Sequence, residues 1–307
     1  MAHPRRGFVV TGPVKRYQLR AFAEHARDWG QNLYVYPVIS RRSRGLSVGV
    51  NLNPDAACNF DCVYCQVDRS QPPRVRTVDL TVLGVELAAM LDWATDGSLF
   101  EHPQFRGLSG ELKVLRDIAF SGDGEPTTCP VFAEAVSLAA ELKRERGLTG
   151  VCLVLITDAC YLSRPEVEAG LTVMDANQGE IWAKLDAGTE EYFRAVNRPN
   201  YSLAHVLANI IHAARIRPVV IQSLWMRLHG QPPPVEEVTA FLDRLRSILR
   251  EGGRIARVQV YTIARRTTEP YATMLSDEEV NDIAARVASA LPVEVAAYYG
   301  VPAAGEA

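Results

Sequence analysis

The stretch Cys58-Asn59-Phe60-Asp61-Cys62-Val63-Tyr64-Cys65 holds three of the six cysteines in this chain. Its spacing is C-x3-C-x2-C, and the asparagine and aspartate between the cysteines favour a loop rich in turns. Such a loop gathers three thiols around one point, and no fourth cysteine lies near it in the sequence. The stretch therefore predicts a site that binds metal through three thiolates.

Three thiolates leave one position of a metal cluster without a protein ligand. Iron–sulfur clusters are normally held by four cysteine thiolates, so a loop with three leaves one iron open. An open iron is what S-adenosylmethionine (SAM) requires, because its amino and carboxylate groups chelate that iron before an electron cleaves its sulfonium. The spacing therefore predicts an iron–sulfur cluster that can bind SAM.

Two other interpretations of the cysteines stay open. A structural zinc ion could take three of them and a fourth ligand from elsewhere, although no second cysteine pair is close by. The cysteines could also be core residues, since a free cysteine behaves as a small apolar side chain. The polar residues between them suit a loop better than a core.

Length and composition favour a globular chain with a substantial core. The 307 residues are 48% hydrophobic and 22% charged, as is typical of such proteins. No apolar run reaches the length of a membrane span, and residues 1–6 lack the apolar region of a secretory signal. We therefore expect a cytoplasmic protein with no membrane partner and no disulfide framework.

Positive charge is concentrated at the start of the chain. Residues 1–44 carry nine lysine and arginine residues against two acidic ones, whereas the whole chain has a net charge of −3. We interpret residues 1–44 as a basic N-terminal extension, most simply a solvated helix with an arginine face. A contact with RNA or with a nucleotide substrate is the alternative.

From residue 45 onward, short apolar runs alternate with helical stretches. The predicted strands are residues 46–52, 118–121, 151–157, 181–185, 219–224 and 258–263. The predicted helices are residues 83–94, 131–146, 204–214, 235–250 and 277–290. Several of the strands are rich in valine and isoleucine and nearly continuous in apolar residues, as strands covered on both faces should be.

This alternation predicts an α/β fold with a parallel sheet and right-handed crossovers. Six units make a partial (β/α)6 TIM-like barrel over residues 45–300, followed by a flexible tail of residues 301–307. In barrels, the loops at the carboxyl ends of the strands face one mouth. The cysteine loop follows the first predicted strand, so we expect the site at that mouth.

Two polar segments follow later strands. Residues 121–127 read Ser-Gly-Asp-Gly-Glu-Pro-Thr; their glycines allow close approach by a ligand, and Glu125 suits an ammonium group. A plain strand-to-helix turn is the alternative. Lys184 and Asp186 end the fourth strand on one face and are costly to bury unless they pair with each other or with a ligand.

These segments, in this order and at these strand ends, resemble the radical SAM superfamily. A narrower resemblance, over residues 38–270, is to the bacterial and archaeal proteins grouped with the wyosine-forming tRNA enzyme. It rests on residues 40–42, 45–52, 58–65, 121–127 and 184–188, and on Asn197-Arg198-Pro199.

The resemblance implies roles for individual residues. Cys58, Cys62 and Cys65 would ligate a [4Fe–4S] cluster, and Tyr64 would lie near the SAM adenine. The SAM contacts implied along the second, fourth and fifth strands are Ser121, Gly122, Asp123, Gly124, Glu125, Lys184, Asp186, Gln222 and Ser223.

The other cysteines differ from the wyosine enzyme, which carries a second cluster upstream of the SAM motif. No cysteine precedes Cys58 here, which argues against wyosine formation itself. Cys129 and Cys152 are expected to be structural. Cys160 follows the third strand and is a candidate hydrogen donor to a product radical, with packing in the core as the alternative.

The resemblance implies a radical SAM enzyme. A ferredoxin- or flavodoxin-like donor would supply the electron that cleaves SAM, and the resulting 5′-deoxyadenosyl radical would take hydrogen from an unidentified substrate, with a nucleotide or tRNA base as the candidate. Two alternatives remain, namely a non-catalytic iron–sulfur electron-transfer or zinc-binding protein, and a radical activase that modifies a protein or peptide.

Overall fold

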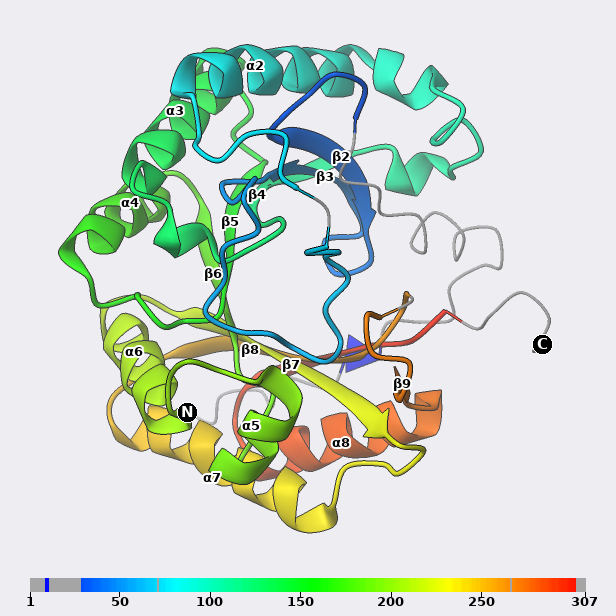
Figure 1. Cartoon of the computed structure of the whole chain (residues 1–307), viewed down its shortest axis with the longest axis vertical. Coiled ribbons are helices and arrows are strands. Elements are labelled where there is room, and N and C mark those ends of the chain that lie inside the picture. The colour runs from blue at the N-terminus through cyan, green and yellow to red at the C-terminus, as the bar shows by residue number, and fades with distance from the viewer. Residues whose placement is uncertain (1–8, 11–28, 71, 266, 302–307) are drawn as a thin grey trace, which may run out of the picture.

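Six parallel strands form the centre of the fold and follow one another in chain order across a curled sheet (Figure 1). The computed structural model describes residues 9–10, 29–70, 72–265 and 267–301. The six strands are β3 (Gly45–Val50), β4 (Leu115–Phe120), β5 (Cys152–Thr157), β6 (Gly179–Lys184), β7 (Val219–Leu228) and β8 (Ile255–Thr262). The predicted partial (β/α)6 barrel is therefore confirmed.

Further strands extend the sheet at both edges. On one edge β2 (Val35–Ser40) pairs antiparallel with β3, and on the other β10 (Glu294–Tyr298) pairs parallel with β8. Beyond β10 lies β1 (Val9–Val10), and β9 (Ala272–Met274) pairs antiparallel with β7. None of these four strands was predicted from the sequence.

The helices lie outside the curled sheet, so the sheet encloses an interior of its own (Figure 1). They are α2 (Leu80–Asp96), α3 (Phe132–Glu145), α4 (Pro165–Asp175), α5 (Glu190–Asn197), α6 (Leu203–Ile216), α7 (Val235–Arg250) and α8 (Asp277–Ala290). Five match predicted helices, whereas α4 and α5 were not predicted. A capping box at Ser276 fixes the start of α8, because the serine and Glu279 satisfy each other's free amides.

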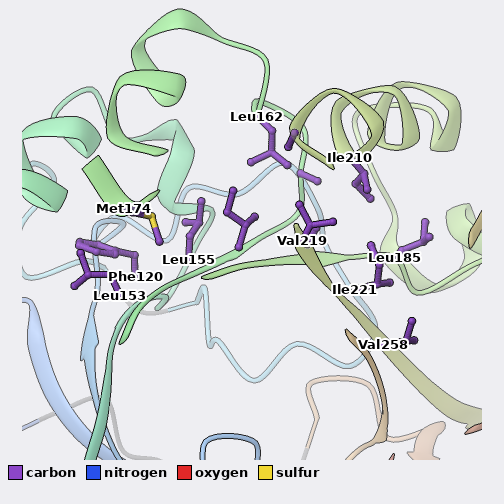
Figure 2. Packing of buried hydrophobic residues seen from close by; sticks show 14 of the residues in the cluster. Phe120, Leu153, Leu155, Leu162, Met174, Leu185, Ile210, Val219, Ile221 and Val258 are labelled. Atoms are coloured by element: carbon purple, nitrogen blue, oxygen red, sulfur yellow. The ribbon is translucent and has the colours of Figure 1, made fainter. Parts of the chain in front are cut away.

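Strand alternation divides the sheet residues between two cores. Leu153, Leu155 and Ile221 point outward and pack under the helices (Figure 2). Val154 and Trp182, one position out of phase, belong to a smaller cluster inside the barrel. Both faces of the sheet are thus covered, and the inner face is the one that positions the site.

The predicted boundary at residue 44 falls in the turn between β2 and β3. The last part of the predicted basic extension, β2, is therefore a strand of the sheet. Within residues 1–44, positions 1–8 and 11–28 lie outside the described residues, as does most of the predicted tail. Within the described part of the chain, no helix combines the length and the apolar character that crossing a bilayer needs.

Candidate active site

A cavity of about 280 Å³ opens inside the barrel, at the carboxyl ends of the strands. Its wall brings together most of the residues that the sequence predicts for the site. Those that line it are Cys58, Cys62, Tyr64, Cys65, Ser121, Gly122, Asp123, Gly124, Glu125, Lys184 and Gln222. Asp186, Ser223 and Cys160, which were also predicted, are not part of its wall.

The cysteine loop follows β3 and is held in place by the end of α5. The backbone amides of Asp61 and Val63 donate to the carbonyls of Asn197 and Val196, at 3.1 and 2.9 Å. Arg198 reinforces this contact from outside, because its guanidinium lies 3.2 Å from the Asp61 carboxylate. The loop is thus fixed by backbone pairing across more than 130 residues of sequence, which leaves its thiols free to face the cavity.

The surroundings of the thiols favour metal binding over nucleophilic chemistry. Burial raises the pKa of Cys58 to about 12 and that of Cys62 to about 11, although Lys184 opposes the second shift. Thiols with raised pKa are poor nucleophiles at neutral pH, and a bound metal is what deprotonates them. Three soft sulfur donors on one cavity wall are the donors that iron–sulfur clusters use.

A single metal ion and a cluster place different demands on these cysteines. In the described part of the chain, no three cysteine, histidine or acidic side chains lie close enough together to hold one ion. In a cluster each thiolate binds its own iron, so the thiolates stand further apart than around one ion. The cluster ligation by Cys58, Cys62 and Cys65 stays a prediction.

The glycine-rich segment after β4 packs directly on the cysteine loop. A Cβ atom on Gly124 would lie 1.9 Å from the carbonyl oxygen of Ala57, and one on Gly122 would lie 2.3 Å from Asn51 Oδ1. The amide of Glu125 donates to that same Ala57 carbonyl at 3.1 Å. Gly124 needs to be glycine because two backbone segments meet there, whereas a Cβ on Gly122 would meet the side chain of Asn51. The contact of Gly124 with Ala57 joins the two predicted binding motifs.

Glu125 lines the cavity, but its carboxylate is hydrogen-bonded by other residues of the protein. Its carboxylate, 2% exposed, accepts hydrogen bonds from the Thr127 amide and hydroxyl, the Thr157 hydroxyl and the Asp158 amide. Burial, and then the Asp158 carboxylate, raise its pKa to about 8. Four internal donors leave Glu125 little capacity for a ligand ammonium. Asp123, half-buried in the same wall, accepts a hydrogen bond from Asn51 Nδ2 at 2.6 Å.

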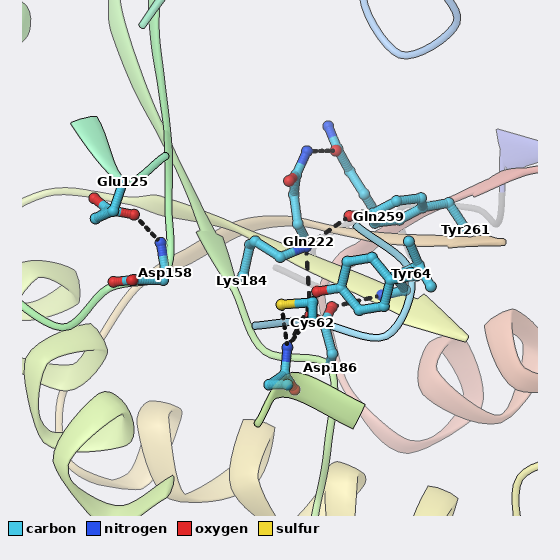
Figure 3. Close-up of polar contacts among 11 residues, drawn as sticks. Cys62, Tyr64, Glu125, Asp158, Lys184, Asp186, Gln222, Gln259 and Tyr261 are labelled. Carbon is cyan, nitrogen blue, oxygen red and sulfur yellow. Dashed lines mark hydrogen bonds and ion pairs between the residues drawn. The ribbon is translucent and has the colours of Figure 1, made fainter. Parts of the chain in front are cut away.

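Lys184 and Asp186 form an ion pair, with 3.3 Å between Nζ and Oδ2 (Figure 3). Asp186 is fully buried and also accepts from the amide of Leu224 at 2.8 Å, from Asn197 at 3.0 Å and from the Tyr64 hydroxyl. Burial alone would lower the pKa of Lys184, but the Asp186 carboxylate raises it above its usual range. The internal ion pair between Lys184 and Asp186, which the sequence left open as the alternative to ligand contact, is therefore present.

The predicted ligand contact of Asp186 stays a prediction. Asp186 does not line the cavity, and both of its carboxylate oxygens accept hydrogen bonds from the protein. It contacts two residues that do line the cavity, Lys184 and Tyr64. Lys184 remains in the wall, with its Nζ 4.8 Å from the centre of the Tyr64 ring.

Two further residues with predicted contacts, Ser223 and Cys160, lie away from the cavity wall. Ser223 shares a face of β7 with Ile221 and Trp225, which belong to the outer core, so its side chain points toward the helices. Cys160 is 2% exposed and belongs to the same core. The preceding Ala159 has a positive φ of 64°, and the chain turns there, away from the mouth. Packing is the role that the structure gives Cys160.

Asn197 is a residue whose function the sequence motifs did not reveal. Its Nδ2 donates toward Cys62 Sγ at 3.4 Å and toward the Tyr64 hydroxyl at 3.1 Å. It lies at the end of α5, a helix that was not predicted, so no periodicity placed it near the cysteines. Its only sequence signal was its position in the Asn197-Arg198-Pro199 segment.

Comparisons with known proteins agree with this architecture. No family model matches the chain. The structure of a radical SAM methyltransferase from Sphaerobacter thermophilus aligns with 86% of this chain and 69% of its own, with a TM-score of 0.58 and 13% identity. The chain shares the fold of that structure. At this level of identity the likeness concerns the fold alone.

Two relatives found by sequence are each about a quarter identical to this chain. A protein named GTPase Obg from Brachyspira hyodysenteriae is 24% identical over 248 residues, which are 80% of this chain and 32% of that protein. A UPF0026 protein of Helicobacter pylori is 25% identical over 250 residues, 80% of this chain and 70% of its own. The chain thus spans about a third of the length of the first relative.

Proposed function

We propose that this chain is a radical SAM enzyme that uses a [4Fe–4S] cluster and SAM to abstract hydrogen from a substrate held in the barrel. When bound, the cluster would supply one electron that cleaves SAM into methionine and a 5′-deoxyadenosyl radical. The observation that supports this most is the joint wall of one cavity. The three cysteines and the glycine-rich segment meet there, and Gly124 packs against the backbone of Ala57.

The chain's own residues would hold the two cofactors in distinct ways. Cys58, Cys62 and Cys65 would be the cluster ligands, oriented by the pairing of their loop with the end of α5. Asp123, with the backbone carbonyls beside it, would bind the SAM amino group. Lys184, kept charged by Asp186, would bind the SAM carboxylate. The protein's contribution is thus position and charge, while the cofactor carries the chemistry.

An external electron donor and a substrate complete the proposal. The donor would be a ferredoxin- or flavodoxin-like protein that passes one electron to the cluster. The radical would then take a hydrogen atom from the substrate, which gives 5′-deoxyadenosine and a substrate radical. A nucleotide or a tRNA base is the proposed substrate class, supported by the sequence resemblance and by the basic residues of the first 44 positions.

Cluster loading of cysteine variants tests the assignment. Cys58→Ala, Cys62→Ala and Cys65→Ala should each lose iron and the broad absorbance near 400 nm after anaerobic reconstitution, and should not cleave SAM under dithionite. Cys129→Ala is the matched control, because Cys129 is half-buried but does not line the cavity. It should load and cleave as the natural chain does.

Three outcomes would favour other functions. Stoichiometric zinc in place of iron would favour a zinc-binding protein, and a loaded cluster that does not respond to SAM would favour an electron-transfer protein. SAM cleavage stimulated by a protein or peptide, rather than by a nucleotide, would favour a radical activase.

A further inference from the structure

Two glutamines face each other inside the barrel, one strand apart. Gln222 on β7 and Gln259 on β8 are partners in the strand register, and the Nε2 of Gln222 donates to the Oε1 of Gln259 at 3.1 Å (Figure 3). Both are fully buried. They share the inner face with Val220, which packs in the cluster inside the barrel, and Gln222 lines the cavity.

This amide pair keeps one donor and one acceptor unused. Gln222 Oε1 and Gln259 Nε2 have no hydrogen-bond partner among the described residues. If both amides were turned over, the mutual hydrogen bond would reverse and again leave one donor and one acceptor free. A buried polar atom without a partner is costly, and an apolar pair of the same shape would avoid that cost. The pair therefore points to a ligand with a complementary edge.

Flat and positively charged groups surround the amide pair. Trp182 and Tyr261 stand on the neighbouring inner positions of β6 and β8 and line the same cavity. The guanidinium of Arg42 lies 5.0 Å from the ring centre of Trp182 and 5.3 Å from that of Tyr261. In the described part of the chain, no carboxylate forms an ion pair with Arg42. Aromatic rings stack on planar ligands, and arginine pairs with phosphate.

We propose that Gln222 and Gln259 form the substrate-recognition site for a nucleobase with an N–H beside a C=O, as in uracil or guanine. The free acceptor takes the N–H and the free donor reaches the C=O, while Trp182 and Tyr261 cover the ring and Arg42 takes a phosphate. This inference rests on the proposed function, because it names the substrate class of the same cavity.

The site is well placed for the proposed chemistry. Gln222 is the register partner of Lys184, and Lys184 lies against the ring of Tyr64, two residues from Cys62 and one from Cys65. A base bound by the amide pair would therefore lie next to the region assigned to SAM, deeper in the barrel. The bound base would also replace the contact that Arg42 makes with the two rings.

Binding of two nucleotides and their N-methylated analogues tests the inference. The chain is reconstituted anaerobically with cluster and SAM, and calorimetry measures the dissociation constants of uridine and guanosine 5′-monophosphates. The analogues are 3-methyluridine and 1-methylguanosine 5′-monophosphates, which lack the N–H. We expect at least one nucleotide to bind about tenfold or more tightly than its analogue, and the double variant Gln222→Leu/Gln259→Leu to lose this difference.

Controls separate recognition from folding and from the proposed function. The double variant should unfold at the same temperature as the natural chain or higher, because both unpaired amides are replaced by apolar groups. Ser223→Ala, which removes a buried hydroxyl on the opposite face of β7, should keep the preference for the unmethylated nucleotide. Iron content and 5′-deoxyadenosine formation by the natural chain report the proposed function independently of nucleotide binding.

Three results would overturn the inference. These are failure of both nucleotides to bind the loaded chain, equal binding of each nucleotide and its methylated analogue, and a preference that persists in the double variant. If the natural chain loads its cluster and cleaves SAM while any of these results is found, the inference that Gln222 and Gln259 recognise a nucleobase is wrong and the proposed function stands. If it does not load or cleave, the proposed function fails first.

Discussion

Replacing Asp186 with asparagine should destabilise the chain more than any change to its partner Lys184. The substitution keeps the shape of the side chain but removes a charge that is fully buried and accepts from Leu224, Asn197 and Tyr64. Asparagine can satisfy only part of these donors. It also leaves the ammonium of Lys184, whose side chain is 16% exposed, without its counter-charge.

The size of the effect follows from this burial. Removing one partner of a buried ion pair costs about 3–5 kcal/mol, and the opening of the cavity beside Lys184 places Asp186→Asn at the lower end, about 3 kcal/mol. With an unfolding entropy of about 2.1 cal/mol/K per residue over 307 residues, this lowers the melting temperature by about 5 °C. Lys184→Met should cost about 1–2 kcal/mol, because Asp186 keeps three other donors.

Chemical unfolding of the metal-free chain measures these differences without contributions from a cluster. In urea titrations followed by circular dichroism, Asp186→Asn should have a lower free energy of unfolding than Lys184→Met. The double variant should lose less free energy of unfolding than the two single variants lose together, by about 1–3 kcal/mol. If Asp186→Asn unfolds within about 0.5 kcal/mol of the natural chain, or if Lys184→Met is the more costly change, Asp186 is not the centre of this network.

Two other substitutions test the contacts around the cysteine loop. Gly124→Ala forces a Cβ into the Ala57 carbonyl, so we expect the free energy of unfolding to fall by about 3 kcal/mol and the iron content to fall as well. Gly107→Ala is the control, because open space surrounds that position, and it should change stability by less than about 0.5 kcal/mol. Equal effects of the two substitutions would refute the contact. Asn197→Leu removes the donor to the Cys62 sulfur and should lower the cluster's reduction potential, by about 59 mV for a tenfold loss of reduced cluster. Electron paramagnetic resonance titration measures it, and an unchanged potential would contradict the role of Asn197.

Much of the barrel could be predicted because its strands are buried on both faces. Runs of mainly apolar residues mark β5 and the first half of β7, and the helices between them carry clear periodicity. The strand β2 escaped prediction because Pro37 interrupts it, and proline is tolerated there only because β2 is the edge of the sheet. Helices α4 and α5 are short, and α5 shows its role only through its contact with the cysteine loop.

The site was predictable where spacing fixes geometry and less so where hydrogen bonds inside the protein decide which groups remain available. Three cysteines in one loop line one cavity, and strand alternation brought Lys184 and Asp186 to the same face, where they pair. Alternation could not show that both oxygens of Asp186 accept hydrogen bonds from the protein. The same rule could have revealed Gln259 beside the predicted Gln222, since two glutamines within otherwise apolar strands on one face indicate a polar group inside a barrel.

Electron–nuclear double resonance of the reduced, cluster-loaded chain with isotopically labelled SAM tests the central claim most directly. With ¹⁵N in the SAM amino group, the account predicts a coupling between that nitrogen and the cluster, since one iron lacks a cysteine ligand. A cluster that is fully loaded and reduced but shows no such coupling would contradict it.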